Sequence, residues 1–202
     1  KQLVSSLRET KKQATRHAIA DSVARLVVDE GVENLTVARI AEAAGVSPRT
    51  FHNYFSSASD ALLFFAASLL ESYSDVIENM YPEMGINEFF ETMLLDVLDD
   101  DQPNLHSLAT LVTIGESIES MSHTAEERQR FEKVAFGIVE AFGRRMPGYS
   151  KLELAILLAA HGAAAKVVLT EIADQESSGT KLSSAEKREI VHHAFQILKQ
   201  IP

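Results

Sequence analysis

The sequence contains no cysteine among its 202 residues. This absence excludes disulfide frameworks, thiolate zinc sites and cysteine nucleophiles, and it is consistent with a reducing cytoplasm. The sequence also lacks a stretch typical of a secretory signal, and its most apolar segment, residues 154–169, is interrupted by His161 and Lys166. We therefore expect a cytoplasmic protein without a membrane span.

Basic residues are outnumbered, with 19 Lys and Arg against 29 Asp and Glu and a formal net charge of −10. That total argues against a polyanionic partner such as DNA. The charge is unevenly distributed, however. Residues 1–55 carry 8 basic and 6 acidic residues, a net of +2, and the remainder carries 11 basic and 23 acidic, a net of −12. This asymmetry is typical of a small nucleic-acid-binding module joined to an acidic domain.

Glycine and proline are few, at 9 and 5 residues, and the 46% of hydrophobic residues is a globular proportion. Apolar residues recur with helical spacing, and no alternating run is long enough to form a sheet, so the pattern predicts an all-α protein with nine helices. Its expected helices are 11–30, 37–44, 48–55, one that Ser57 opens and Pro82 ends, 87–98, 105–120, 125–145, 151–173 and 184–200.

Residues 36–55, TVARIAEAAGVSPRTFHNYF, meet the requirements of a helix-turn-helix. Two short helices that cross steeply need a small residue at the crossing, a glycine in the turn and an apolar residue to fill the gap. Ala41, Gly45 and Val46 occupy these three places. Thr36 and Ser47 are positioned to cap the two helices.

The second of these helices presents polar side chains outward. Phe51 and Phe55 lie one turn apart and are expected to face inward, which turns Arg49, His52 and Asn53 to the outside. Arginine hydrogen-bonds well to guanine and asparagine to adenine, and a short helix fits the major groove of DNA. The pattern therefore predicts readout of base pairs.

From Arg16 to Leu62 the sequence resembles the DNA-binding domain of the TetR family of transcriptional regulators. The resemblance is carried by Ile19, Gly31, Thr36-Val37, Ile40-Ala41, Ala44-Gly45-Val46-Ser47, Thr50-Phe51, Tyr54-Phe55 and Ala61-Leu62. It implies phosphate contacts from Thr36, Arg39, Thr50 and Tyr54, groove contacts from Pro48, Arg49, His52 and Asn53, and backbone or minor-groove contacts from Lys11, Lys12 and Arg16. Many relatives carry a lysine at the place of Ala58, and that phosphate contact is expected to be absent here.

A single helix-turn-helix makes too few contacts to select a site, so we expect a homodimer on a palindromic operator in double-stranded DNA. The resemblance implies that the last two helices form a four-helix bundle with those of the second copy. The interface residues it implies are Leu154, Leu158, His161, Ala165, Val191, Ala194, Phe195 and Leu198. The alternative is that these residues form the core of a single chain.

The resemblance also implies that the helices between the two ends enclose a pocket for a small hydrophobic effector. Its expected lining is Phe64, Phe65, Met80, Met84, Phe89, Phe90, Met93, Met121, Phe131 and Phe136, with His106 and His123 as polar contacts. Aromatic and methionine side chains at helical spacing more often form an ordinary core.

These observations imply a helix-turn-helix DNA-binding domain over residues 1–57 and an effector-binding and dimerisation domain over residues 58–202. The expected function is a ligand-responsive transcriptional regulator, usually a repressor in this family, with no enzyme activity, cofactor or metal. Two alternatives stay open. One is a constitutive DNA-binding regulator without an effector. The other is a helical metal-carboxylate enzyme, for which Glu189 and His192 have the right spacing but lack a second such pair.

Overall fold

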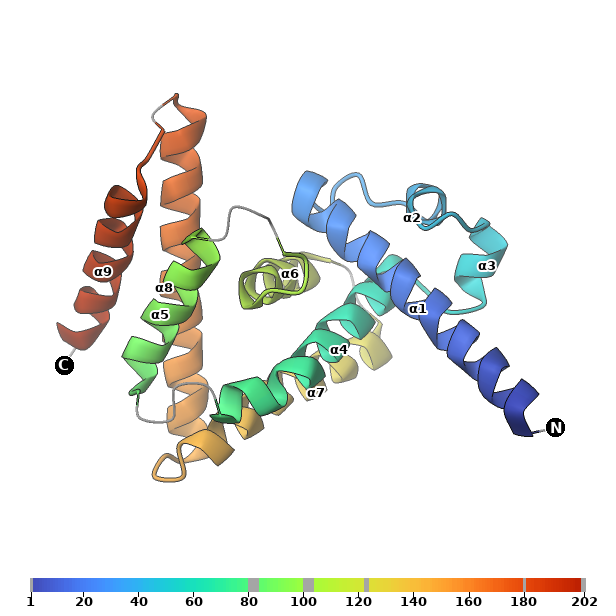
Figure 1. Ribbon diagram of the computed structural model, residues 1–202, viewed down its shortest axis with the longest axis horizontal. Coiled ribbons are helices and arrows are strands. Elements are labelled where there is room, and N and C mark those ends of the chain that lie inside the picture. The colour runs from blue at the N-terminus through green and yellow to red at the C-terminus, as the bar shows by residue number, and fades with distance from the viewer. Residues whose placement is uncertain (1, 80–83, 100–103, 122–123, 180, 201–202) are drawn as a thin grey trace. The chain divides into compact units, whose positions relative to one another are not determined.

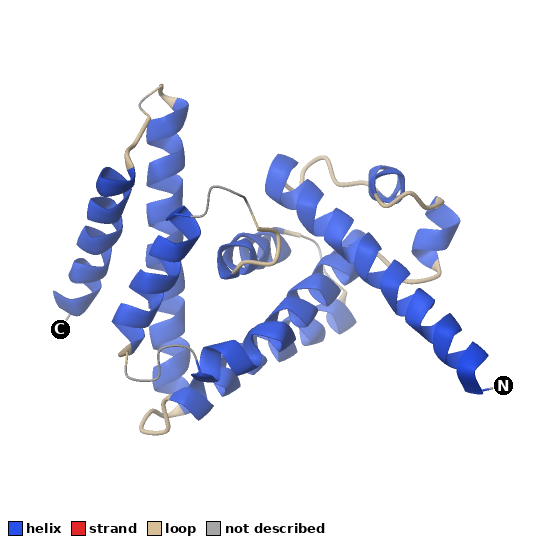
Figure 2. Cartoon of the chain, in the orientation of Figure 1, coloured by secondary structure: helices blue, strands red, loops and turns tan. Residues whose placement is uncertain are grey.

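The computed structural model describes residues 2–79, 84–99, 104–121, 124–179 and 181–200. Within these ranges the chain forms nine α-helices and no strand, which confirms the all-α expectation. Figures 1 and 2 show how these helices are arranged along the chain. The helices are α1 (Gln2–Glu30), α2 (Val37–Ala43), α3 (Pro48–His52), α4 (Ala58–Asn79), α5 (Ile86–Asp99), α6 (Leu108–Ser120), α7 (Ala125–Arg145), α8 (Lys151–Ser177) and α9 (Ser184–Gln200).

Several helix ends differ from the expected ones; α6, for example, begins at Leu108 and not at residue 105. Three of the differences have a clear local cause. The first helix begins at Gln2 because residues 2–10 contain no proline or glycine and are rich in helix-favouring leucine, glutamine, arginine and glutamate. α3 ends at His52, since the Tyr54 N–H donates to the Phe51 carbonyl only three residues back and closes a turn. α8 continues to Ser177, where the following Gly179 has a φ of 94°.

The chain divides into two compact units. The first unit comprises Lys1–Glu71 and Thr113–Ala135, and the second comprises Ser72–Val112 and Phe136–Pro202. The first unit therefore contains the helix-turn-helix, the start of α4 and the first half of α7. The functional boundary at residue 57 stays a prediction.

The core of the first unit joins α1 to the helix-turn-helix and α4. Ile19, Val23 and Val27 form one buried face of α1, as their spacing predicts. The second unit has its own core between α5, α8 and α9, which stand side by side in Figure 1. Its buried residues are Leu94, Ala165, Val168, Ile172, Leu182, Val191 and Phe195.

Candidate nucleic-acid interface

The turn of the helix-turn-helix has the predicted geometry. Gly45 has a φ of 65°, a left-handed conformation that glycine adopts without a steric penalty. The N–H of Val46 donates to the carbonyl of Ala41 at 2.8 Å, and Ala41 is buried where the helices cross. The backbone thus returns from α2 into α3 within a few residues.

Side-chain caps fix the start of both helices. The Thr36 Oγ1 accepts the Arg39 N–H at 3.3 Å, and the Ser47 Oγ accepts the Thr50 N–H at 3.0 Å. The hydroxyls of Ser47 and Thr50 also lie 2.8 Å apart, and Pro48 occupies the first turn of α3. The predicted capping roles of Thr36 and Ser47 are therefore confirmed, and each cap satisfies a backbone donor at its helix end.

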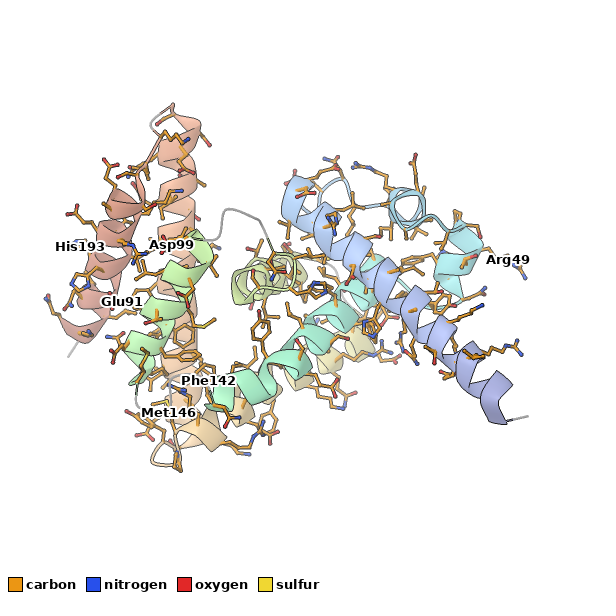
Figure 3. The ribbon with its side chains drawn as sticks, viewed as in Figure 1. Arg49, Glu91, Asp99, Phe142, Met146 and His193 are labelled. Atoms are coloured by element: carbon orange, nitrogen blue, oxygen red, sulfur yellow. The ribbon has the colours of Figure 1, made fainter. Side chains whose placement is uncertain are left out.

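The orientation of α3 follows from its two phenylalanines. Phe51 and Phe55 are buried against each other, with ring centroids 6.0 Å apart. Arg49, His52 and Asn53 are exposed, and Figure 3 shows Arg49 on the outer side of α3. Pro48 is also exposed, whereas Thr50 and Tyr54 are half-buried. The structure thus brings the four predicted groove-contacting residues to one short, solvent-facing segment.

Arg39 is committed to an ion pair within the chain. Its Nη2 lies 2.6 Å from the Glu30 Oε2, and its Nη1 donates to the Asn34 carbonyl at 3.4 Å. Both side chains of the pair are partly exposed, so the interaction is weak and solvent-screened. A DNA phosphate would have to compete with Glu30 for this guanidinium.

Arg16 has a structural role that the sequence does not reveal. Its guanidinium carbon lies 4.2 Å from the Phe64 ring centroid and 5.3 Å from the Phe55 centroid. Its Nε is buried and has no hydrogen-bond partner. Lys11 and Lys12, in contrast, are exposed on α1. Of the three residues predicted to contact the DNA backbone or minor groove from the first helix, only these two lysines present their charge to solvent without such packing.

Polar contacts join the start of α4 to the start of α7. The Ser57 Oγ accepts the Asp60 N–H at 2.9 Å, as its predicted capping role requires. The Asp60 carboxylate, which is buried, accepts the backbone N–H of Ser56 at 3.0 Å and the Arg130 Nη1. The Ser57 hydroxyl donates to Glu127. Ala58 is half-buried and carries no charge toward solvent.

The predicted ligand-pocket residues are divided between the two units. Phe64, Phe65, Met121 and Phe131 belong to the first unit, and Phe89, Phe90, Met93 and His106 to the second. Phe65 is buried, and Phe64 packs on His17 with a centroid distance of 5.1 Å. Met80, His123 and the side chain of Phe131 lie outside the described residues, and Phe136 is exposed. The pocket stays a prediction.

An aromatic cluster occupies the second unit. Phe90 stacks on Phe142 with an interplanar angle of 11°, and Phe89 meets Phe142 edge-on. Arg145 lies 4.5 Å above the Phe89 ring and donates to the carbonyls of Ile77 and Met84. Burial lowers the pKa of Arg145. This arginine therefore ties the end of α4 to the segment before α5.

The predicted dimer residues lie mostly inside a single chain. Five of them are buried in the second unit, namely Leu154, His161, Ala165, Val191 and Phe195, and Leu158, Ala194 and Leu198 are half-buried. The chain itself covers these side chains, as the alternative reading of the sequence allowed. The same two helices expose different apolar residues: Leu152 at 70%, Ile156 at 59%, Val167 at 65% and Ile197 at 50%.

His161 links three helices of the second unit. Its Nδ1 lies 2.7 Å from the Leu157 carbonyl oxygen, and its Nε2 lies 2.8 Å from the Asn87 Oδ1 of α5. The Asn87 Nδ2 donates to the Phe195 carbonyl of α9 at 3.4 Å. Burial lowers the pKa of His161, and the hydrogen bond to Leu157 acts in the opposite direction.

The other chemistries raised by the sequence receive no support from the geometry. Among the described residues, no group of three or more histidine, aspartate or glutamate side chains is placed to hold a metal ion. His192 contacts Glu91 at 2.8 Å instead. α8 is long and apolar enough to cross a membrane by length and composition, but a core helix passes the same test, so it is no sign of insertion.

Comparison with known proteins agrees with this geometry. Residues 19–61 match the model of the bacterial regulatory proteins of the tetR family. The transcriptional regulator BetI of Rhizobium meliloti (strain 1021) is 38% identical over 60 residues, which are 30% of each chain. The chain therefore matches about a third of that relative's length.

Solved structures resemble the chain over nearly its whole length. The fatty acid degradation regulator FadR of Bacillus halodurans has a TM-score of 0.59 at 16% identity, covering 93% of this chain and 95% of that one. FadR of Bacillus subtilis, in complex with stearoyl-CoA, has the same TM-score and identity, and the match covers 91% of this chain and 97% of that one. At this identity the likeness concerns the fold. Residues 19–61 thus match the tetR family of bacterial regulatory proteins, and the whole chain shares the all-α fold of these solved regulators.

Proposed function

We propose that the protein binds a palindromic DNA operator as a homodimer and releases it when a small hydrophobic effector binds. The observation that carries this proposal is the solvent-facing set Arg49, His52 and Asn53 on a helix held by buried Phe51 and Phe55. A short helix with this polar face fits the major groove. As is usual in this family, we expect repression of the genes beside the operator, in the cytoplasm.

The contacts to DNA divide into two classes. Lys11, Lys12, Thr36, Thr50 and Tyr54 are proposed to hold phosphates, which set the register without reading sequence. Arg39 joins them when a phosphate displaces Glu30. The groove floor is assigned to Pro48, Arg49, His52 and Asn53. Because Arg16 packs on Phe64, we propose that it orients α1 and makes no direct contact with DNA.

Dimerisation is assigned to the exposed apolar face of α8 and α9. Leu152, Ile156, Ala159, Ala163 and Val167 are exposed and recur every three or four residues of α8, which places them on one side of the helix. Small alanines in this stripe let a facing helix approach closely. An uncovered stripe of this kind is costly in water and is typical of an interface. The predicted dimer residues that the chain buries, such as Ala165 and Phe195, instead pack in the core that supports α8 and α9.

The effector is proposed to be a small apolar molecule. Support for a ligand comes from FadR of Bacillus subtilis, whose structure contains stearoyl-CoA, and from the aromatic cluster of α5 and α7. Stearoyl-CoA is therefore the first probe. The proposal predicts that a ligand of this class lowers operator affinity. A protein that holds its operator equally with and without a panel of apolar ligands would be a constitutive regulator.

The experiment that tests DNA recognition is selection of bound duplexes from a random pool. We expect an enriched palindrome whose half-sites lie one helical turn, or a multiple of one, apart. If the protein recovers only random sequence at low salt and no duplex at physiological salt, it has no specific operator.

A further inference from the structure

The start of α4 and the start of α7 exchange polar contacts in both directions. Asp60 of α4 accepts a charged hydrogen bond from Arg130 of α7, and Glu127 of α7 accepts a hydrogen bond from Ser57, which directly precedes α4. Residues 57 and 60, like residues 127 and 130, are separated by three positions and so lie on one face of each helix. We call these four residues the α4–α7 clamp.

The clamp reaches residues 48–55, which we call the recognition segment, through Asp60. One oxygen of this carboxylate contacts Arg130, and the other accepts both the backbone N–H of Ser56 at 3.0 Å and the Ser56 hydroxyl at 2.9 Å. Ser56 directly follows Phe55, the buried residue that sets the orientation of α3. Arg130 and the exposed face of α3 are therefore connected by two hydrogen-bonded steps and one buried side chain.

The burial of Asp60 makes the positive charge of Arg130 important. The Asp60 side chain retains only 9% of its exposure, so its negative charge is largely removed from water. An uncompensated charge in such a place is strongly unfavourable, whereas a paired one is tolerated. Hydrogen bonding to Glu126 raises the pKa of Arg130, which keeps the guanidinium charged. Without Arg130, the α3–α4 turn would rearrange to expose the Asp60 carboxylate to water.

The far end of the clamp is also fixed. The Glu127 carboxylate accepts the Thr124 N–H at 2.7 Å, and the Thr124 Oγ1 accepts the Glu127 N–H at 3.2 Å, which is a reciprocal cap of α7. Glu127 is buried. The helix that carries Arg130 is therefore held at the turn where it meets α4, and it belongs to the same compact unit as the helix-turn-helix.

We propose that Arg130, although it lies 75 residues beyond the recognition segment, is a positioning residue for DNA readout that acts through Asp60 and Ser56. This inference rests on the proposed function. According to this proposal, a residue of the predicted effector domain changes operator affinity without touching DNA. A DNA contact is not required, because the charge of Arg130 is used inside the clamp.

The test is a double-mutant cycle on operator affinity, with Arg128→Met as the matched control because Arg128 is exposed on the same turn of α7. Arg130→Met is expected to weaken operator binding at least tenfold, and Arg128→Met less than twofold. Asp60→Asn removes the buried charge, so Arg130→Met should cost less than threefold when added to it. The slope of affinity against salt should stay that of the wild type, since no phosphate contact is lost.

A second measurement distinguishes a loss of folding from a local change at the α3–α4 turn. Arg130→Met should speed hydrogen exchange of the Ser56 amide while exchange in the α1 core stays slow. If the single variant fails to fold, the comparison of Asp60→Asn with Asp60→Asn/Arg130→Met decides, and a tenfold difference between them overturns the proposal. Equal operator affinity for folded Arg130→Met and Arg128→Met also overturns it. A wild type that selects no operator refutes the proposed function instead.

Discussion

The guanidinium of Arg16 lies over the ring of Phe64, with its carbon 4.2 Å from the ring centroid. This contact joins α1 to α4, and Phe55 completes the stack from the end of the recognition segment. A cationic side chain near the start of a DNA-binding domain is readily interpreted as a phosphate contact. Here its surroundings indicate that it stabilises the domain.

Arg16→Ala should therefore lower the free energy of unfolding by about 1–2 kcal/mol, because a partly desolvated cation–π contact and its aliphatic packing are lost. Urea unfolding measures the change. Arg25→Ala, at an exposed position of the same helix, should cost less than about 0.5 kcal/mol. A stable Arg16→Ala variant whose operator binding depends less on salt would mean that the residue contacts DNA.

Lys12→Ala is expected to act on DNA binding and leave stability unchanged. Removing one phosphate contact should weaken binding to all duplexes alike and reduce the log–log salt slope by about 1. Fluorescence anisotropy over a salt series gives this slope. Lys199→Ala removes the same charge from α9 and should leave the slope unchanged. Equal slopes for Lys12→Ala and the wild type would remove this lysine from the interface.

Acid should destabilise the second unit through His161. Burial lowers its pKa in the folded state, so below the unfolded value of about 6.5 the unfolded chain binds the extra proton first. The stability that the neutral His161 side chain contributes is therefore fully present above that pH. It is lost as the pH falls toward the lowered folded pKa. Thermal unfolding between pH 7.5 and 5 should show a smaller loss for His161→Gln than for the wild type, with exposed His193→Gln behaving as the wild type. Parallel curves for all three proteins would contradict this assignment.

Ile156→Glu should convert the proposed dimer to a monomer, because it places a charge in the middle of the exposed stripe on α8. Sedimentation equilibrium at micromolar concentration measures the mass. Val28→Glu introduces the same charge at another exposed apolar position, on α1, and should remain dimeric. A dimeric Ile156→Glu protein would move the interface away from this face.

Local rules sufficed for the helix-turn-helix. The caps at Thr36 and Ser47, the left-handed Gly45 and the inward pair Phe51 and Phe55 depend on residues no more than a few positions apart. Each is dictated by backbone geometry or by helical periodicity, so the sequence alone could predict them. The same holds for the nine helices, whose type the structure confirms within the described ranges.

Contacts between distant residues were not predictable. The pair Asp60 and Arg130 is separated by 70 positions, and nothing in either neighbourhood specifies the other. The choice of dimer residues stays a prediction, and it was difficult for a different reason. Residues 154–169, LAILLAAHGAAAKVVL, are apolar on every side of the helix, so periodicity cannot distinguish the side that packs on α5 from the side that faces solvent. The sequence consequently favoured residues that the chain itself buries.

The central claim is that α3 reads base pairs in two symmetric half-sites, and repeating the duplex selection with Arg49→Ala tests it most directly. The wild type should enrich a palindrome, and Arg49→Ala should enrich the same palindrome with preference lost at one base pair in each half-site, a discrimination of about 1–3 kcal/mol per contact. An identical preference from both proteins, or no enriched sequence from the wild type, would contradict the claim.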